Sequence, residues 1–295
     1  MDVSIIIINY NTISFLCDAI DSIIEKAQGI SYEIIVVDNN SSDNSDCIIS
    51  EKFADKVVYV KLPENIGFGR ANNEGIKIAK GKNLFLLNPD TILRNNAVKI
   101  LSNYMNEHQN VGVCCGNIFD ADGSPAYSFM PVFQSIFYEI DLLLHNMLFR
   151  IIWGKKFWFN KTEKPKYVAH VTGADMMVRR CIALVTGGFD SDFFMYGEET
   201  EWIYRIKKLG YKVVSVPQAE IIHFAGKSFD VNTDRIKMIL SGRNLFYHKT
   251  HGSIYCSIAN LIYGLTALSR IVFFALAGNK IKTRKWSYIL KNICS

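Results

Sequence analysis

Short apolar runs alternate with helical patterns through the first part of the chain. The runs lie at residues 3–8, 33–37, 57–60 and 83–87. Runs of about four to eight apolar residues are typical of strands buried on both faces of a sheet. Between the first two runs, apolar residues recur at helical spacing in residues 15–24. Strands that alternate with helices predict an α/β fold with a doubly wound, mostly parallel sheet and right-handed crossovers.

The second part of the chain has a less regular pattern. Residues 111–115 and 212–216 predict two further strands, and residues 198–209 predict an amphipathic helix that Gly210 ends. Residues 133–159 are rich in aromatic and aliphatic side chains, but charged residues interrupt them too often for a membrane span. This stretch predicts either a pair of core helices or a surface that touches lipid or a lipid-linked substrate.

Residues 254–277 form the most apolar segment of the chain, and Arg270 is its only charged residue. A spanning helix needs about 20 mostly apolar residues, so the length permits a span. A charge near the bilayer centre costs about 2.5 to 3.5 kcal/mol, and a span would place the basic tail outside, against the positive-inside tendency. The pattern therefore favours a packed or interfacial helix, with the basic residues 280–285 on anionic lipid.

Composition narrows the class of protein. The chain has 295 residues, of which 49% are hydrophobic and 21% charged, so it is globular and large enough for one domain with appendages. The net charge of +5 is too diffuse to predict a nucleic-acid partner. Seven cysteines without C-x-x-C spacing fit a reduced protein. Asp2 stands where a signal peptide would be basic, so we expect a cytoplasmic active part.

Polar tripeptides follow three of the predicted strands, at residues 9–11, 38–40 and 88–90. The carboxyl ends of parallel strands meet at one edge of a sheet, where open α/β folds bind ligands, so these tripeptides predict a nucleotide crevice. Asp38 can accept a hydrogen bond from a pyrimidine imide or a ribose hydroxyl there, and Tyr10 can stack on the base. No glycine follows the first strand, so the dinucleotide fingerprint is absent from that position.

The tripeptide Asn88-Pro89-Asp90 holds a carboxylate at the end of the fourth predicted strand. Proline has no amide hydrogen for the sheet and forces a turn. Asp90 can therefore hold a divalent cation against a phosphate. Alternatively, Asp90 caps the helix predicted to start near Asn95, or closes the turn. Spacing alone leaves both interpretations open.

Several motifs, taken together, resemble the family 2 glycosyltransferases, and more narrowly their rhamnosyltransferase-type branch. In the first half they are Ile7–Asn11, Val36–Asp43, Asn65–Asn73 and Leu87–Asp90. In the second half they are Gly173-Ala174, Arg179-Arg180, Gly188–Asp190, Phe193–Glu199, Arg205, Gly210-Tyr211, His223 and Arg243-Asn244. The resemblance keeps its order from residue 3 to about residue 250, which makes it far more specific than any single motif.

The resemblance implies a GT-A fold that binds a nucleotide-diphospho-sugar, with a dTDP- or UDP-linked donor. The implied donor-binding residues are Asn9, Tyr10, Asn11, Asp38, Asn40, Asn65, Gly67, Phe68, Arg70, Asn72, Asn88, Asp90 and Gly173. It divides the chain into a glycosyltransferase domain (1–250) and a C-terminal helical, membrane-associating region (251–295). The first would hold a nucleotide-sugar-binding half (1–118) and an acceptor or catalytic half (119–250).

The resemblance also implies a metal site for Mg²⁺ or Mn²⁺ on the donor diphosphate. The family's aspartate-x-aspartate motif appears here as Asn88-Pro89-Asp90, so ligation rests mainly on Asp90. A hard cation with oxygen ligands offsets the charge that builds on the leaving nucleoside diphosphate. His223 matches a further metal ligand of related enzymes, whereas its position alone is equally that of a structural histidine.

Two acidic residues are candidates for the general base. Inverting transfer needs one base to take a proton from the acceptor hydroxyl. The resemblance places it at Glu199, where the family usually has aspartate, and Glu198 stays an alternative because adjacent helical residues point about 100° apart. Both also suit a helix amino terminus without any chemistry. Arg179 and Arg180 can bind the diphosphate or an acceptor phosphate, or can simply be solvated.

The sequence thus predicts an inverting, metal-dependent glycosyltransferase. It would move a sugar, with rhamnose as one candidate, from a nucleotide-diphospho-sugar to a lipid-linked or polysaccharide acceptor in cell-surface glycan synthesis. We expect it to be peripheral at the inner face of the cell membrane, with no nucleic-acid partner. The alternatives are a galactofuranosyl- or N-acetylhexosaminyl-transferase of the same fold, and a catalytically silent nucleotide-sugar-binding scaffold suggested by Asn88 and Glu199.

Overall fold

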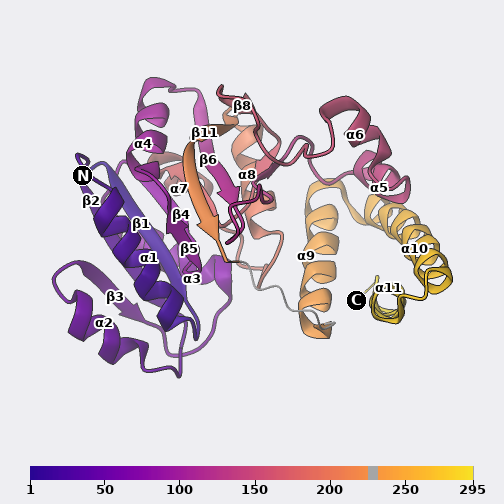
Figure 1. The fold of residues 1–295 in the computed structure, drawn as a ribbon, viewed down its shortest axis with the longest axis horizontal. Coiled ribbons are helices and arrows are strands. Elements are labelled where there is room, and N and C mark those ends of the chain that lie inside the picture. Colours follow the sequence, from indigo (N-terminus) through magenta and orange to yellow (C-terminus); the bar gives the residue numbers. More distant parts are fainter. Residues whose placement is uncertain (225–231, 295) are drawn as a thin grey trace.

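The computed structural model describes residues 1–224 and 232–294 (Figure 1). The first part of the chain alternates strands with helices: β1 (Val3–Asn9), α1 (Ile13–Lys26), β2 (Tyr32–Asp38), α2 (Ser45–Phe53), β3 (Val57–Lys61), α3 (Phe68–Ile78), β4 (Asn83–Leu87), β5 (Thr91–Leu93), α4 (Ala97–Glu107) and β6 (Val111–Phe119). The remainder comprises β7 (Phe129–Met130), α5 (Ile136–Leu143), α6 (Met147–Trp153), β8 (Lys166–Tyr167), β9 (His170–Val171), β10 (Asp175–Arg179), α7 (Arg180–Thr186), α8 (Glu198–Lys208), β11 (Lys212–His223), α9 (Thr233–His251), α10 (Ser253–Leu276) and α11 (Lys280–Lys291).

Within the described residues, nine strands form one mixed sheet. Eight follow the order β3-β2-β1-β4-β10-β6-β11-β5, and β8 pairs with β11. Strands β3, β2, β1 and β4 are parallel, which confirms the predicted doubly wound half. The strand predicted at residues 111–115 corresponds to β6, but β6 does not lie beside β4. The antiparallel strand β10 lies between them, because it pairs with both.

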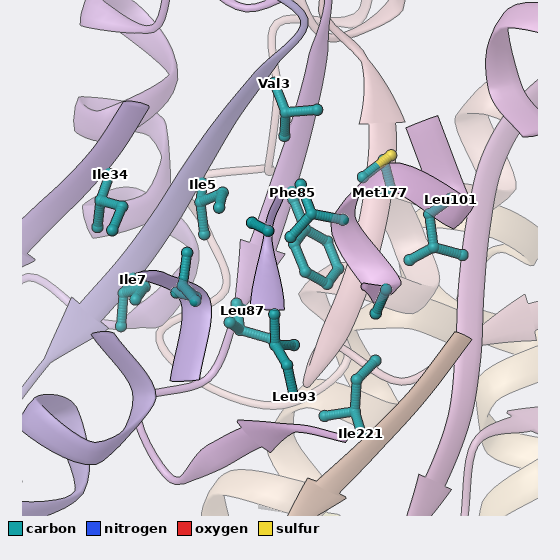
Figure 2. Packing of buried hydrophobic residues seen from close by; sticks show 14 of the residues in the cluster. Val3, Ile5, Ile7, Ile34, Phe85, Leu87, Leu93, Leu101, Met177 and Ile221 are labelled. Atoms are coloured by element: carbon teal, nitrogen blue, oxygen red, sulfur yellow. The ribbon is translucent and has the colours of Figure 1, made fainter. Parts of the chain in front are cut away.

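The sheet buries both faces, as the uninterrupted apolar runs require. Side chains alternate across a strand, so Ile5 and Ile7 of β1 point to one face and Ile6 and Ile8 to the other. The first face packs under α1, α2 and α4, and Figure 2 shows its centre around Phe85. The second face packs under α3, α7 and α8. These two cores fix the strand ends that carry the polar tripeptides.

A group of helices lies beside the sheet and includes α5, α6, α9, α10 and α11 (Figure 1). Two helices, α5 and α6, form within residues 133–159. Much of their apolar surface is exposed, so they are not a pair of core helices. Helix α10 contacts α5, α9 and α11. It is the one helix among the described residues that is long and apolar enough to cross a membrane.

Asparagines precede two helices of the first part of the chain. Helix α2 begins after Asn44, which has a positive φ of 58°. Asn96 caps α4 by accepting a hydrogen bond from the amide of Lys99. The Asp90 side chain is therefore not the cap of α4. That leaves Asp90 available to the edge of the sheet where β4 ends.

Candidate active site

Asp90 and His223 meet at the carboxyl end of the sheet although they are 133 residues apart. His223 is the last residue of β11 and pairs with Thr91 at the start of β5, directly after the Asn-Pro-Asp turn. This antiparallel pairing places His223 Nε2 3.1 Å from Asp90 Oδ1. The side chain of Asp90 is 25% exposed and that of His223 is 19% exposed, so a ligand can reach both.

Backbone hydrogen bonds hold this corner in place. The amide of Asn88 donates to the carbonyl of Ala174 at 3.0 Å, which ties the turn to the segment before β10. The hydroxyl of Thr91 donates to the carbonyl of Asn88 at 2.7 Å and closes the turn. The Asn88 amide group also lies 3.4 Å from His223 Nε2. The proline turn thus aims Asp90 toward the end of β11.

The chemistry of these side chains fits a divalent cation that shares its coordination sphere with a ligand's phosphates. Among the described residues, no cluster of three or more His, Cys, Asp or Glu side chains could hold a metal by protein ligands alone. Mg²⁺ is commonly bound by one or two carboxylates plus phosphate oxygens and water. The carboxylate of Asp90 supplies one such ligand, and the imidazole of His223 and the side-chain amide of Asn88 lie beside it.

Asn9 and Asp38 are completely buried below the strand ends. The side-chain amide of Asn9 donates to Asp38 Oδ2 at 2.7 Å, and the backbone amide of Ser41 donates to Asp38 Oδ1 at 2.8 Å. These hydrogen bonds hold the loop after β2 in place. A direct contact of Asn9 or Asp38 with a nucleotide stays a prediction.

The exposed tips of the same loops lie where the sequence predicted them. Tyr10 is 49% exposed just after β1, so its ring is free to meet a base. Asn11 and Asn40 both adopt positive φ, which asparagine tolerates better than most residues. The Asn11 side chain accepts a hydrogen bond from the backbone of Ser42 at 2.8 Å, which joins the first two loops. Their roles in donor binding stay predictions.

The loop before α3 is built against a second loop that precedes α8. Gly67 has a φ of 89°, and a Cβ there would overlap the carbonyl oxygen of Phe194. The amide of Phe68 donates to that same carbonyl at 2.9 Å. Asn65 accepts hydrogen bonds from the Asn39 side chain at 2.9 Å and from the amide of Gly67 at 3.0 Å. Only glycine fits at position 67, because the two backbones touch there.

Arg70 and Asn72 make hydrogen bonds near this junction. Arg70 Nε donates to the carbonyl of Ser191 at 2.6 Å. Asn72 is buried, and its side chain donates to the carbonyl of Phe68 one turn earlier in α3. A role of these two side chains in binding the nucleotide-sugar stays a prediction.

Glu198 and Glu199 occupy different environments at the start of α8. Glu198 is 4% exposed, and its Cγ lies 3.4 Å from the Cβ position of Gly69 in α3. Burial and the neighbouring Glu199 charge raise the pKa of Glu198 to about 8. Glu199 is only partly buried and borders Gly173, at 3.9 Å from that residue's Cβ position. Burial also raises the pKa of Glu199.

The residues Gly173-Ala174 connect the two acidic parts of the site. Gly173 lies beside Phe68 and Glu199, whereas the Ala174 carbonyl binds the amide of Asn88. The segment before β10 therefore touches both the turn that carries Asp90 and the Glu199 side chain.

Arg179 and Arg180 lie at the other end of the sheet. Arg179 pairs with Asn83, the first residue of β4, whereas Asp90 follows the last. Its guanidinium is buried and donates to the carbonyls of Val111, His108 and Met105. Their predicted contact with the diphosphate at this site is wrong, because β10 runs antiparallel to β4 and carries both arginines away from its carboxyl end.

Two residues at this site were missed by the sequence-based prediction. Asn39 is buried and joins Asn65 to the amide of Ile66, although only its neighbours Asp38 and Asn40 were singled out. Phe194 supplies the carbonyl that anchors Phe68. Asn39 lies in the same polar tripeptide, so its position was the available signal. A backbone carbonyl leaves no such signal in a sequence.

The fold and the strand-end site define a GT-A protein, and known structures share this fold. The mannosyltransferase PcManGT from Pyrobaculum calidifontis, solved in complex with GDP-Man and Mn²⁺, superposes with a TM-score of 0.63 at 16% identity, over 99% of this chain and 87% of that one. The sequence model described as glycosyl transferase family 2 matches residues 4–184. The chain belongs to glycosyl transferase family 2.

Relatives in this family carry names from surface-glycan synthesis. The hexosyltransferase Agl10 of low-salt glycan biosynthesis, from Haloferax volcanii, is 24% identical over 89% of this chain and 82% of that protein. An N-acetylglucosaminyl-diphospho-decaprenol L-rhamnosyltransferase from Mycobacterium tuberculosis is 25% identical over 66% of this chain and 67% of that protein. The minor teichoic acid biosynthesis protein GgaB of Bacillus subtilis is 33% identical over 41% of this chain, which spans only 14% of GgaB.

Proposed function

We propose that this chain is an inverting glycosyltransferase that moves a sugar from a nucleotide-diphospho-sugar to a hydroxyl of a lipid-linked or polysaccharide acceptor. One observation carries the proposal. Asp90 and His223 meet at the carboxyl end of the sheet, and Glu199 borders Gly173, whose neighbour Ala174 binds the amide of Asn88 beside Asp90. A cation site for a diphosphate and a partly buried base are the two parts that such a transfer needs.

The residues supply the following chemistry. The Glu199 carboxylate takes the proton from the acceptor hydroxyl while that oxygen bonds to the anomeric carbon. The bond between the anomeric carbon and the diphosphate oxygen breaks, and the nucleoside diphosphate leaves with the electron pair. A divalent cation, when bound, offsets the negative charge on that leaving group. Burial raises the pKa of Glu199, which makes its carboxylate a stronger base.

Glu198 supports the base and is not the base itself. Its carboxyl is almost inaccessible, and its pKa of about 8 keeps it protonated at neutral pH. A protonated neighbour adds no charge beside Glu199, so Glu199 keeps its own charge at a lower cost. We therefore propose Glu199 rather than Glu198 as the general base.

The acceptor is proposed to be presented at a membrane surface. Seven apolar residues of α10 are exposed along one face, at spacings of three and four residues: Ile254, Ile258, Leu261, Leu265, Leu268, Val272 and Leu276. Such spacing forms a continuous apolar stripe on a helix. The mycobacterial relative is named for a decaprenol-linked sugar, so a lipid-linked acceptor suits this stripe.

The charge distribution favours an anionic lipid surface. Residues 235–295 contain ten Lys and Arg and no Asp or Glu, so residues 1–234 carry 23 cations against 28 carboxylates. The overall charge of +5 hides this division. Each cation near an anionic leaflet contributes about 1 kcal/mol. We propose that the C-terminal region (251–295) is the part that binds the cytoplasmic leaflet and that residues 1–250 carry the chemistry.

Helix α10 is proposed to lie in the plane of the interface. Its opposite face packs on other helices and buries Ala259, Thr266 and Ala267. Arg270, the only charge of the helix, donates to the carbonyl of Leu142 at 2.8 Å and also contacts His145 in the segment after α5. A helix that spans the bilayer would lose this packing, whereas a helix in the interface keeps it.

A donor screen tests the function. The protein is incubated with Mn²⁺, a polyprenyl-diphospho-N-acetylglucosamine acceptor and UDP- or dTDP-linked sugars including dTDP-rhamnose, and the products are analysed. We expect transfer from at least one donor with inversion at the anomeric carbon. Glu199→Gln should bind the donor but transfer at least 100-fold more slowly, in the range for loss of a general base. Donor binding without any transfer by the unaltered protein would favour the scaffold alternative.

A further inference from the structure

Three consecutive residues of α9, Gly242, Arg243 and Asn244, contact three separate parts of the molecule. Consecutive helical residues point about 100° apart, so a tripeptide can reach in three directions. None of these residues lies in the site described above. Together they connect the segment before α8 to the helices of the proposed membrane surface. Helix α8 itself carries Glu199.

Gly242 touches the turn that begins α8. A Cβ at this position would overlap the carbonyl oxygen of Tyr196 and would lie 2.9 Å from its carbonyl carbon. In return, the carbonyl oxygen of Gly242 lies 3.2 Å from the Cβ position of Gly197. Tyr196 and Gly197 both adopt positive φ, of 70° and 93°. A tyrosine with positive φ is strained, so this turn keeps its shape only where its surroundings enforce it.

Arg243 joins α9 to α5 and α10 through a buried guanidinium. Its Nε lies 2.9 Å from Glu139 Oε1 of α5. Its Nη1 and Nη2 donate to Asn260 Oδ1 and to the carbonyl of Ala259, both in α10. The hydroxyl of Tyr247 donates to the same Glu139 oxygen at 2.7 Å. A buried ion pair with these extra hydrogen bonds fixes its partners in one geometry.

Asn244 extends the connection to the last helix. Its side chain donates to the carbonyl of Ile293 at 2.8 Å, just after α11. The thiol of Cys256 in α10 approaches the carbonyl of Asn244 at 3.6 Å. The position of α9 is therefore set by α5, α10 and α11 together.

We infer that Gly242, Arg243 and Asn244 form a positioning joint that holds the Tyr196-Gly197 turn, and through it the Glu199 carboxylate, at a fixed place relative to the membrane-binding helices. Arg243 and Asn244 fix α9 on those helices. The backbone of Gly242 contacts the turn directly, so the position of α9 sets the position of the turn. This inference rests on the proposed function for the role of Glu199 and for the membrane binding of the helices. The joint itself rests on the contacts.

The variant Gly242→Ala tests the joint, with Ser241→Ala as its matched control on an exposed position of the same helix. Hydrogen exchange of the amides in residues 195–200 is measured first. We expect faster exchange in Gly242→Ala and unchanged exchange in Ser241→Ala. Steady-state transfer is measured next. We expect kcat to fall by about 10- to 100-fold, as for a small misplacement of a catalytic group, with donor Kd and acceptor KM unchanged.

A second variant keeps the test decisive should Gly242→Ala fail to fold. Tyr196→Gly accepts the positive φ without strain but makes the turn flexible, so it should fold and show the same exchange and the same loss of kcat. Unchanged exchange at residues 195–200 in the folded variant would overturn the joint, as would donor Kd weakened in proportion to kcat. Faster exchange in a protein whose unaltered form transfers no sugar would support the joint and overturn the proposed function.

Discussion

Replacing Glu198 by glutamine should change how the stability of the protein depends on pH. The Glu198 carboxyl is buried beside α3, and its burial together with the Glu199 charge raises its pKa from 4.5 to about 8. In the unfolded chain the carboxyl ionises near its ordinary value. Between these two pH values the folded state holds a proton that the unfolded state has lost, so raising the pH favours unfolding.

The size of this effect follows from the shift. A pKa difference of one unit corresponds to about 1.4 kcal/mol. The shift of Glu198 from 4.5 to about 8 therefore removes on the order of 4 to 5 kcal/mol of stability as the pH rises through that window. The contribution is complete below pH 4.5, and it is lost by about pH 8. Glutamine is neutral at every pH and keeps the shape of the protonated acid, so the variant lacks this loss.

Urea unfolding at pH 5, about pH 7 and about pH 9 measures the effect, because the linear extrapolation gives the free energy of unfolding at each pH. Glu198→Gln should gain stability relative to the unaltered protein by about 1.4 kcal/mol for each pH unit in the window. Glu64→Gln, at an exposed position, is the control and should follow the unaltered protein. Parallel curves for Glu198→Gln and the unaltered protein would refute the assignment of a protonated, buried Glu198.

Three further predictions concern the metal corner, the loop before α3 and the lipid surface. Asp90→Asn should weaken Mn²⁺-dependent donor binding at least tenfold in calorimetric titration, since the amide cannot offer a charged ligand, and equal binding would contradict the metal role. Gly67→Ala should lower the free energy of unfolding by at least about 1 to 3 kcal/mol more than Gly123→Ala in urea, because both have positive φ but only Gly67 touches another backbone. The pair Leu261→Glu and Leu265→Glu should abolish sedimentation with anionic vesicles while the melting temperature stays the same, and retained sedimentation would contradict docking through the stripe.

The parallel half of the sheet could be predicted because each of its strands is a separate apolar run with a turn after it. Strand β10 could not be placed in that way. Asp175–Arg179 has three apolar residues between two charged ones, and nothing local indicates that it enters between β4 and β6. The strands with which β10 pairs are set by contacts between residues far apart in the sequence. The same pairing places Arg179 away from the predicted phosphate contact.

The candidate site, too, could be predicted from the sequence only in part. Asp90 and His223 were expected as a pair, and the pairing of β11 with β5 brings them together. The burial of Asp38 could not be foreseen, because the hydrogen bonds from Asn9 and Ser41 depend on how three loops close over one another. Sequence identifies which polar groups stand at strand ends, whereas the loops decide which of them meet solvent.

The late arrival of β10 has a consequence for synthesis of the chain. Strand β4 is wholly buried in the finished sheet, and β10 covers one of its edges. Residues 88–174 separate the two strands, so at about 5 to 20 residues per second the ribosome delivers β10 some 5 to 20 seconds after β4. During that interval an apolar strand offers an unpaired edge to other nascent chains. Chaperone dependence and aggregation of truncated products should therefore concentrate on chains that end between β4 and β10.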